Sequence, residues 1–212
     1  MTPEPALALR PLFGLIAALA FGVAAHADPL AGAALVKALQ GGGYVLVMRH
    51  ASSPQPPPSA AEADPGNPGH ERQLDEAGRR AAIAMGAAVL ALRLPIGEVW
   101  SSPTYRALQT VRLAGLPAPM TAPELGDGGQ SMQSASRDQA AWLRRQAARP
   151  PKAGSDTVIV THFPNMSAAF GAAAAGLADG EALVFHPGGE TANDPVARIR
   201  IEDWPRLAAA KP

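Results

Sequence analysis

Two apolar runs dominate the pattern of hydrophobic and polar positions along the chain. Residues 44–48 and 157–161 are almost wholly apolar and rich in β-branched side chains. A strand covered by helices on both faces has no polar face, so it shows a continuous apolar run rather than an alternation. We therefore expect both segments to be central strands of a parallel sheet. Shorter runs at 99–101, 182–185 and 196–201 are expected to complete the sheet.

Helical patterns alternate with these strands. The segment 74–92 has acidic residues in its first turn and arginines after it, which is typical of a helix start. The other expected helices are 30–39, 104–113, 137–148 and 166–175. Alternation of helices and apolar strands predicts a single three-layer α/β domain with a mostly parallel central sheet.

Two segments lack both periodicities. Residues 51–70 contain six prolines among small and polar residues, and residues 116–136 are rich in proline, glycine and polar side chains. Proline and glycine favour turns and loops. We expect the first segment, which follows Arg49 and His50, and the second, which carries Glu124 and Asp127, to be loops beside a functional site.

The N-terminus has the layout of a secretory signal. Arg10 precedes an apolar run at 12–25, and Ala25-His26-Ala27 forms an A-x-A cleavage site. The run is short for a bilayer span. We predict a signal peptide over 1–27, a catalytic domain over 28–212, and a periplasmic or secreted location without stable membrane anchoring after cleavage. An uncleaved anchor is the alternative.

The amino-acid composition indicates which partners and which chemistry to expect. Eighteen basic and eighteen acidic residues cancel, so the chain lacks the basic field that would hold nucleic acid. Hydrophobic residues make up 47% of the chain, which is sufficient for one globular domain. The absence of cysteine excludes disulfides, thiolate nucleophiles and cysteine-based zinc sites. The oligomeric state is left open.

Charged and ionisable residues follow three of the predicted strands. Arg49 and His50 follow the first, Arg106 lies shortly after the second, and His162 follows the third. In open α/β sheets, ligands bind outside the carboxyl ends of the strands. A guanidinium matches two phosphate oxygens and keeps its charge, so this combination favours a phosphate ligand.

Four segments resemble motifs of the histidine phosphatase superfamily, which includes acid phosphatases and phosphoglycerate mutases. They are the Arg-His pair after a strand at 46–51, Arg72-Gln73-Leu74-Asp75-Glu76-Ala77-Gly78, the Ser-Ser-Pro-x-x-Arg-Ala-x-Gln-Thr segment at 101–110, and the strand ending in His162 at 160–165. The resemblance spans residues 44 to about 186. It implies a phosphoglycerate mutase-like fold.

The resemblance also implies roles for individual residues. His50 would be the nucleophile that forms a phosphohistidine, while Arg49, Arg106 and His162 would bind the phosphoryl oxygens. Neighbouring arginine charges disfavour protonation of His50, which agrees with that role because attack requires a neutral imidazole. This chemistry needs no metal and no cofactor.

The general acid and a further phosphate ligand are less well defined. A leaving alkoxide needs a proton, and the family usually takes it from the loop after the second motif. That loop offers Glu124, which we prefer, and Asp127; Glu181, Asp64, Glu71 or no protein acid are further alternatives. Ser52 or Ser53, just after His50, could bind phosphate, and we select Ser53.

We therefore expect a phosphomonoesterase that hydrolyses a small phosphate ester. A non-catalytic module that binds phosphorylated ligands is the first alternative, and a phosphoglycerate mutase-type phosphotransferase is the second. Export argues against the mutase, since its substrates are cytoplasmic. The sequence does not select the natural substrate.

Overall fold

The computed structural model describes residue 1 and residues 29–128, 132–188 and 194–210. The predicted signal segment lies outside the described residues apart from Met1. Among the residues that are described, no helix is long and apolar enough to cross a membrane.

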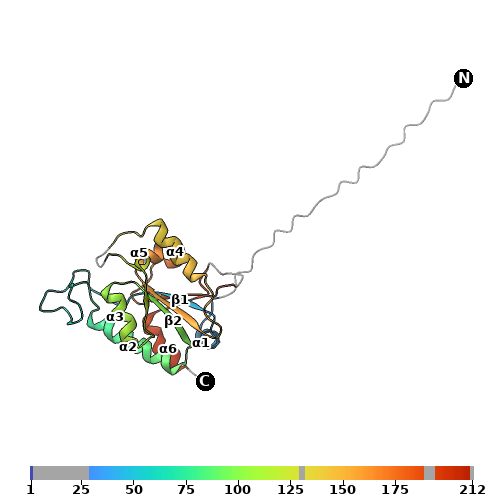
Figure 1. Ribbon diagram of the computed structural model, residues 1–212. Helices are drawn as coiled ribbons and strands as arrows, with labels where there is room; N and C mark the ends of the chain where they lie inside the picture. The colour runs from blue at the N-terminus through green and yellow to red at the C-terminus, as the bar shows by residue number, and fades with distance from the viewer. Residues whose placement is uncertain (2–28, 129–131, 189–193, 211–212) are drawn as a thin grey trace.

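The centre of the molecule is a six-stranded sheet in the order β3-β2-β4-β1-β5-β6 (Figure 1). The strands are β1 Val45–Arg49, β2 Ile96–Ser101, β3 Met120–Thr121, β4 Asp156–Thr161, β5 Ala182–Phe185 and β6 Ala197–Ile199. The pairs β3·β2, β2·β4 and β4·β1 are parallel, and the pairs β1·β5 and β5·β6 are antiparallel. The mostly parallel sheet predicted from the sequence is confirmed.

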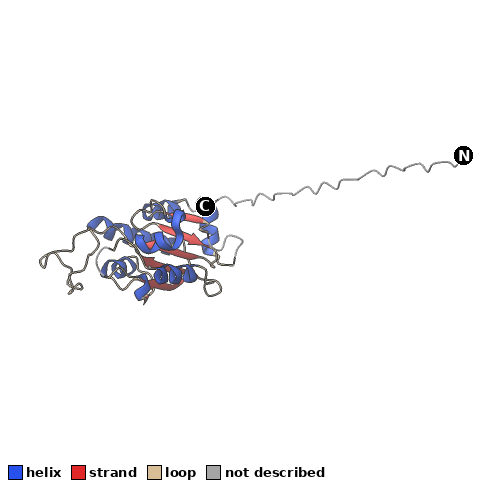
Figure 2. Ribbon diagram, turned by 90° about the horizontal axis from the view of Figure 1, so that it is seen from above, coloured by secondary structure: helices blue, strands red, loops and turns tan. Residues whose placement is uncertain are grey.

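Helices cover both faces of this sheet (Figure 2). They are α1 Gly32–Gln40, α2 Glu76–Ala91, α3 Tyr105–Leu113, α4 Arg137–Ala147, α5 Phe163–Phe170 and α6 Trp204–Ala209, with 3-10 turns η1 Pro123–Leu125, η2 Gly171–Ala174 and η3 Ile201–Asp203. Side chains of α1, α2, α3 and α6 join one hydrophobic core, and those of α4 and α5 join the other. The three-layer α/β domain is therefore confirmed as well.

Strand β1 shows why its run is continuously apolar. Leu46 and Met48 enter the core under α2, whereas Val45 and Val47 enter the core under α4 and α5. All four are at most 3% exposed, and full burial of each such side chain contributes roughly 1.5–3 kcal/mol. The parallel register then pairs Arg49 with Thr161, so the residues that follow both strands are neighbours.

The structure departs from the expected elements in a few places. Strand β2 begins at Ile96 rather than 99 because Ile96 already pairs with Asp156 of β4. Helix α5 begins at Phe163 rather than 166, and Pro164 in its first turn suits that start. The second loop contains β3 and η1, and its residues 129–131 lie outside the described part. Helix α6 was not predicted.

Candidate active site

Three parallel strands bring the site together at their carboxyl ends. His50 follows β1, Ser102 follows β2 and His162 follows β4. The His50 and His162 rings lie edge to face, with centroids 5.2 Å apart. These three residues are buried. The convergence expected from the sequence is thus present in the fold.

The His50 imidazole is neutral and oriented. Its Nδ1 lies 2.7 Å from the Ala51 carbonyl oxygen, so Nδ1 carries the proton and donates it to that acceptor. Nε2 is left with a lone pair and accepts a hydrogen bond from Arg106 Nε at 3.2 Å. Burial, together with the charges of Arg106 and Arg49, lowers the pKa of His50 to about 3. A neutral imidazole whose Nε2 carries a lone pair is the form that can attack phosphorus once the Arg106 hydrogen bond is released.

Arg106 joins the two histidines. Its side chain is fully buried, and its Nη2 donates to His162 Nδ1 at 3.1 Å in addition to the bond from Nε to His50. Nη2 also forms an ion pair with the Asp127 carboxylate. Burial lowers the pKa of Arg106, and the charge of Asp127 opposes that effect. The guanidinium therefore stays charged in a nearly dry environment.

His162 is held in the complementary tautomer. Since Nδ1 accepts from Arg106, Nε2 carries the proton and donates it to Ser102 Oγ at 2.8 Å. Ser102 Oγ also accepts from the Thr104 backbone N–H at 3.2 Å. Burial, with the nearby His50 and Arg106, lowers the pKa of His162 far below its ordinary value. Ser102 therefore orients His162, a role that its place in the sequence motif does not reveal.

The rest of the second motif positions the loop that follows His50. Thr110 Oγ1 accepts the backbone N–H of Ala51 at 3.1 Å and donates to the Arg106 carbonyl at 2.9 Å. Gln109 Oε1 accepts the Leu74 N–H at 2.8 Å. Helix α3 thus carries Arg106 and also fixes the two neighbouring motifs.

A glycine allows α2 to approach the same loop. The Asp75 carboxylate caps α2 by accepting Gly78 N–H at 2.7 Å, and its other oxygen accepts Ser52 Oγ–H at 2.6 Å. A Cβ at Gly78 would lie 2.2 Å from the Ser52 carbonyl oxygen, which no side chain can tolerate. This contact explains the glycine in the segment Leu74-Asp75-Glu76-Ala77-Gly78.

Arg49 lies at the rim rather than in the buried centre. Its side chain is 22% exposed, forms an ion pair with Asp179 at 2.6 Å, and donates to the Leu177 carbonyl at 3.2 Å. Its guanidinium carbon also lies 5.8 Å from the centroid of the Phe163 ring. Arg49 is close enough to lower the pKa of both site histidines.

Arg72 is a site residue that the sequence reasoning did not select. It is only 4% exposed, and its Nε and Nη2 donate to the carbonyls of Pro54 and Ser53 at 2.7 and 3.1 Å. Its charge also lowers the pKa of His50 and His162. The signal that could have found it is its position at the head of the second resembling motif, within the loop next to His50.

The two candidate acids behave differently. Asp127 is 4% exposed, pairs with Arg106, and has an oxygen 3.5 Å from His162 Nδ1. Glu124 is half-buried in η1, and its carbonyl accepts from Asn165 Nδ2 at 3.0 Å. Within the described residues, no hydrogen bond or ion pair joins the Glu124 side chain to the histidines or to Arg106. The catalytic role of Glu124 stays a prediction, while the carboxylate that the structure brings to the site is that of Asp127.

Ser53 serves the loop in this structure. Its hydroxyl donates to the Gln73 carbonyl at 2.8 Å, and its own carbonyl accepts from Arg72. The predicted hydrogen bond from Ser53 to substrate stays a prediction. Asp64 fixes the same loop from the other side, because its carboxylate accepts from Arg79 and from Gln109 Nε2 at 2.7 Å.

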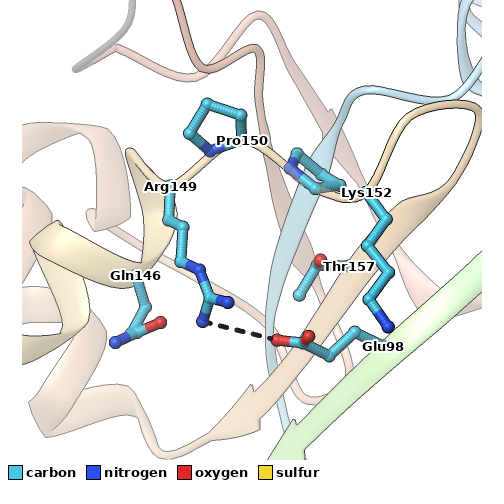
Figure 3. Close-up of a pocket in the computed structure, with 7 residues that line it drawn as sticks. Glu98, Gln146, Arg149, Pro150, Lys152 and Thr157 are labelled. Carbon is cyan, nitrogen blue, oxygen red and sulfur yellow. Dashed lines mark ion pairs between the residues drawn. The ribbon is translucent and has the colours of Figure 1, made fainter.

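A separate cavity of about 250 Å³ lies at the amino ends of β2 and β4 (Figure 3). Arg149 and Glu98 face each other across it, with 3.8 Å between their nearest nitrogen and oxygen. Gln146, Lys152 and Thr157 complete the polar part of its wall.

Across the described residues, no group of three histidine or acidic side chains is arranged to hold a metal ion.

Comparison with known proteins gives a structural likeness only. No family model and no curated protein matches the sequence. The chain is similar to the proposed phosphohistidine phosphatase SixA from Agrobacterium tumefaciens, with 19% identity, 68% of this chain and 92% of that chain covered, and a TM-score of 0.48. It is also similar to the protein histidine phosphatase SixA complexed with tungstate, with 19% identity, 66% of this chain and 86% of that chain covered, and a TM-score of 0.47. A third similar structure is a phosphoserine phosphatase variant from Entamoeba histolytica in complex with phosphoserine, with 14% identity, 71% of this chain and 96% of that chain covered, and a TM-score of 0.46. Identities this low leave the function to be argued from the site of this chain.

Proposed function

We propose that this protein is a phosphomonoesterase that hydrolyses a small phosphate ester through a phosphohistidine on His50. The observation that carries the proposal is the environment of His50 Nε2. This nitrogen has a lone pair, receives a hydrogen bond from the buried Arg106, and lies in a site that also holds His162 and Arg72. A nucleophile surrounded by fixed positive charge suits an incoming phosphate dianion.

In the first step, the phosphate lies beside His162 and accepts hydrogen bonds from Arg106, Arg72 and Arg49, and the Arg106 Nε–H moves from His50 Nε2 to a phosphoryl oxygen. His50 Nε2 then forms a bond to phosphorus while the bond from phosphorus to the ester oxygen breaks. Negative charge on the equatorial oxygens is stabilised by the guanidinium groups, which are held in place before substrate arrives. The hydrogen bond from His50 Nδ1 to the Ala51 carbonyl stabilises the positive charge that develops on the ring.

Asp127 is the general acid in this mechanism. In the free protein its carboxylate is paired with Arg106, which favours the ionised form. A phosphate dianion that binds to Arg106 competes for this partner and repels the carboxylate, so proton uptake becomes favourable. The protonated Asp127 then donates to the leaving oxygen. In the second step the ionised Asp127 accepts a proton from water as the water oxygen bonds to phosphorus; the bond from phosphorus to His50 Nε2 breaks, inorganic phosphate leaves, and neutral His50 is restored.

The location is proposed together with the function. A signal peptide over 1–27 would place the catalytic domain in the periplasm or outside the cell, where the substrates would be small phosphate esters. Secretion of the full chain with loss of its first 27 residues, read by N-terminal sequencing, tests this part separately.

The principal experiment is steady-state hydrolysis of p-nitrophenyl phosphate without added metal and with EDTA. We expect turnover in the wild type that survives chelation and is lost in His50→Ala. A wild type that binds inorganic phosphate but shows no turnover would refute the phosphatase and favour the phospho-ligand-binding module.

A second experiment separates the two candidate acids. Asp127→Asn and Glu124→Gln are compared on p-nitrophenyl phosphate, whose leaving group needs little protonation, and on an alkyl phosphate. We expect Asp127→Asn to lose about 100-fold on the alkyl ester and far less on the aryl ester. The same selective loss in Glu124→Gln instead would restore Glu124 as the acid.

A further inference from the structure

The leaving group of any substrate must lie at the rim of this site. His50, Arg106 and His162 are at most 3% exposed, so the leaving group of a substrate would extend away from this buried centre towards more exposed side chains. Two side chains next to residues of this centre are more exposed: Arg49, which precedes His50 and is 22% exposed, and Phe163, which follows His162 and is 37% exposed.

Phe163 is unusual for its exposure. It is the only exposed phenylalanine, tyrosine or tryptophan in the described part of the chain. It directly follows His162, and its ring centroid is 5.8 Å from the guanidinium carbon of Arg49. An aromatic ring left in contact with water forgoes the stabilisation that burial would give. Its position between a site histidine and a rim arginine suggests a use for that surface.

We propose that Phe163 is a specificity-determining residue that selects phosphate monoesters with a planar aromatic leaving group. This inference rests on the proposed phosphatase function. An aryl group attached to a phosphate at His50 would leave the buried centre next to Phe163 and stack on its ring. The Arg49 guanidinium lies over the same ring, with 5.8 Å between its central carbon and the ring centroid, so the aryl group would use the exposed part of the ring. A saturated leaving group of equal size would gain contact area but no stacking.

The test compares phenyl phosphate with cyclohexyl phosphate in the wild type, Phe163→Leu and Phe163→Tyr. Leucine retains apolar area without a ring, and tyrosine retains the ring. We expect Phe163→Leu to lower kcat/KM for phenyl phosphate about three- to tenfold and to change that for cyclohexyl phosphate less than twofold. Because each substrate is compared with itself, the different intrinsic reactivities of the two esters cancel. Phe163→Tyr should retain the aryl preference.

Equal losses on both substrates in Phe163→Leu, or no loss on either, would overturn the proposal. A short phosphotyrosyl peptide forms a further arm, since a free aryl phosphate and a phosphorylated tyrosine present the same chemistry. The substrate with the higher kcat/KM shows whether the aryl phosphate comes from a small molecule or from a peptide. Phe163→Leu must lower kcat/KM for both of them.

Binding of phenylphosphonate and cyclohexylphosphonate, measured by calorimetry, keeps this inference separate from the phosphatase assignment. If the wild type hydrolyses no ester, the phosphatase fails. Selective loss of phenylphosphonate affinity in Phe163→Leu would still support the aryl subsite, and equal affinities in all variants would refute it.

Discussion

The two ends of the parallel strands both bury ionisable groups, but these groups have different partners at each end. At the carboxyl end, His50 and His162 lie against the buried Arg106, and Asp127 balances its charge. At the amino end, Asp156 is buried with the backbone N–H of Tyr44 as the donor to one oxygen, and its other oxygen has no hydrogen-bond partner among the described residues. Burial raises the pKa of Asp156 to about 6.

Burial favours the neutral form at both ends, but the neighbours decide what the site can do. At the carboxyl end, neutral imidazoles and fixed guanidinium groups create a place for an external anion. At the amino end, the Asp156 carboxyl group has one hydrogen-bond donor, and no cation among the described residues forms an ion pair with it. We therefore expect phosphate chemistry at the carboxyl end of the strands and not at the amino end, and the following variants test that division.

His50→Ala should have the largest effect. Loss of the nucleophile is expected to lower kcat for p-nitrophenyl phosphate about ten-thousand-fold or more. His186→Ala is the matched control, because His186 also follows a strand but lies at the amino end, stacked on Tyr44 with 4.8 Å between ring centroids. That variant should keep its activity within twofold. Comparable losses in both would contradict the division.

Arg106→Lys should come next. The guanidinium donates through Nε to His50 and through Nη2 to His162 and Asp127, and a lysine ammonium cannot reproduce that geometry. We expect kcat to fall roughly 100- to 1,000-fold. Arg80→Lys, at an exposed pair on α2, provides the control. Full activity in Arg106→Lys would show that only a positive charge is required.

Asp156→Asn tests the amino end of the strands through its effect on the free energy of unfolding. Because burial raises the pKa of Asp156 in the folded state, its protonated carboxyl group contributes to the free energy of unfolding. This contribution is fully present below the ordinary pKa of 3.8 and is lost as pH rises through about 6. At pH 7 the variant should therefore be more stable than the wild type by roughly 2–3 kcal/mol, measured by urea unfolding, with the difference disappearing near pH 4. Glu76→Gln, an exposed carboxylate, should show no such trend. A wild type that is more stable than Asp156→Asn at pH 7 would contradict the prediction.

Ser102→Ala should have the smallest effect. It removes the acceptor of His162 Nε2–H and leaves that donor buried, so we expect a loss of about tenfold in kcat/KM. Ser101→Ala is the control, because Ser101 Oγ donates only to the Ser102 carbonyl and does not reach His162. Equal losses in the two variants would mean that Ser102 acts through general packing.

The sequence predicted the parts of the molecule that depend on periodicity. Continuous apolar runs located β1 and β4, and parallel strands must bring the residues after them together, so the meeting of His50 and His162 followed from the pattern. The short elements were missed for the same reason. Strand β3 has two exposed residues, and α6 has six residues, so neither carries enough of a pattern to be recognised.

The parts that depend on the path of a loop were not predictable. Glu124 and Asp127 are three residues apart beside glycines, and the turn geometry after η1 decides which carboxylate reaches Arg106. Arg72 lies in a loop without regular structure, where hydrogen bonds to the Ser53 and Pro54 carbonyls fix its place. Such bonds leave no periodic trace in a sequence.

The most direct test of the account is to trap the phosphoenzyme. The wild type is mixed with p-nitrophenyl phosphate, quenched within milliseconds in alkali, where phosphohistidine is stable, and mapped by peptide mass spectrometry. The account predicts one phosphoryl group on His50, absent in His50→Ala and present in His186→Ala. Turnover by the wild type with no phosphoryl group on His50, or with one on another residue, would contradict it.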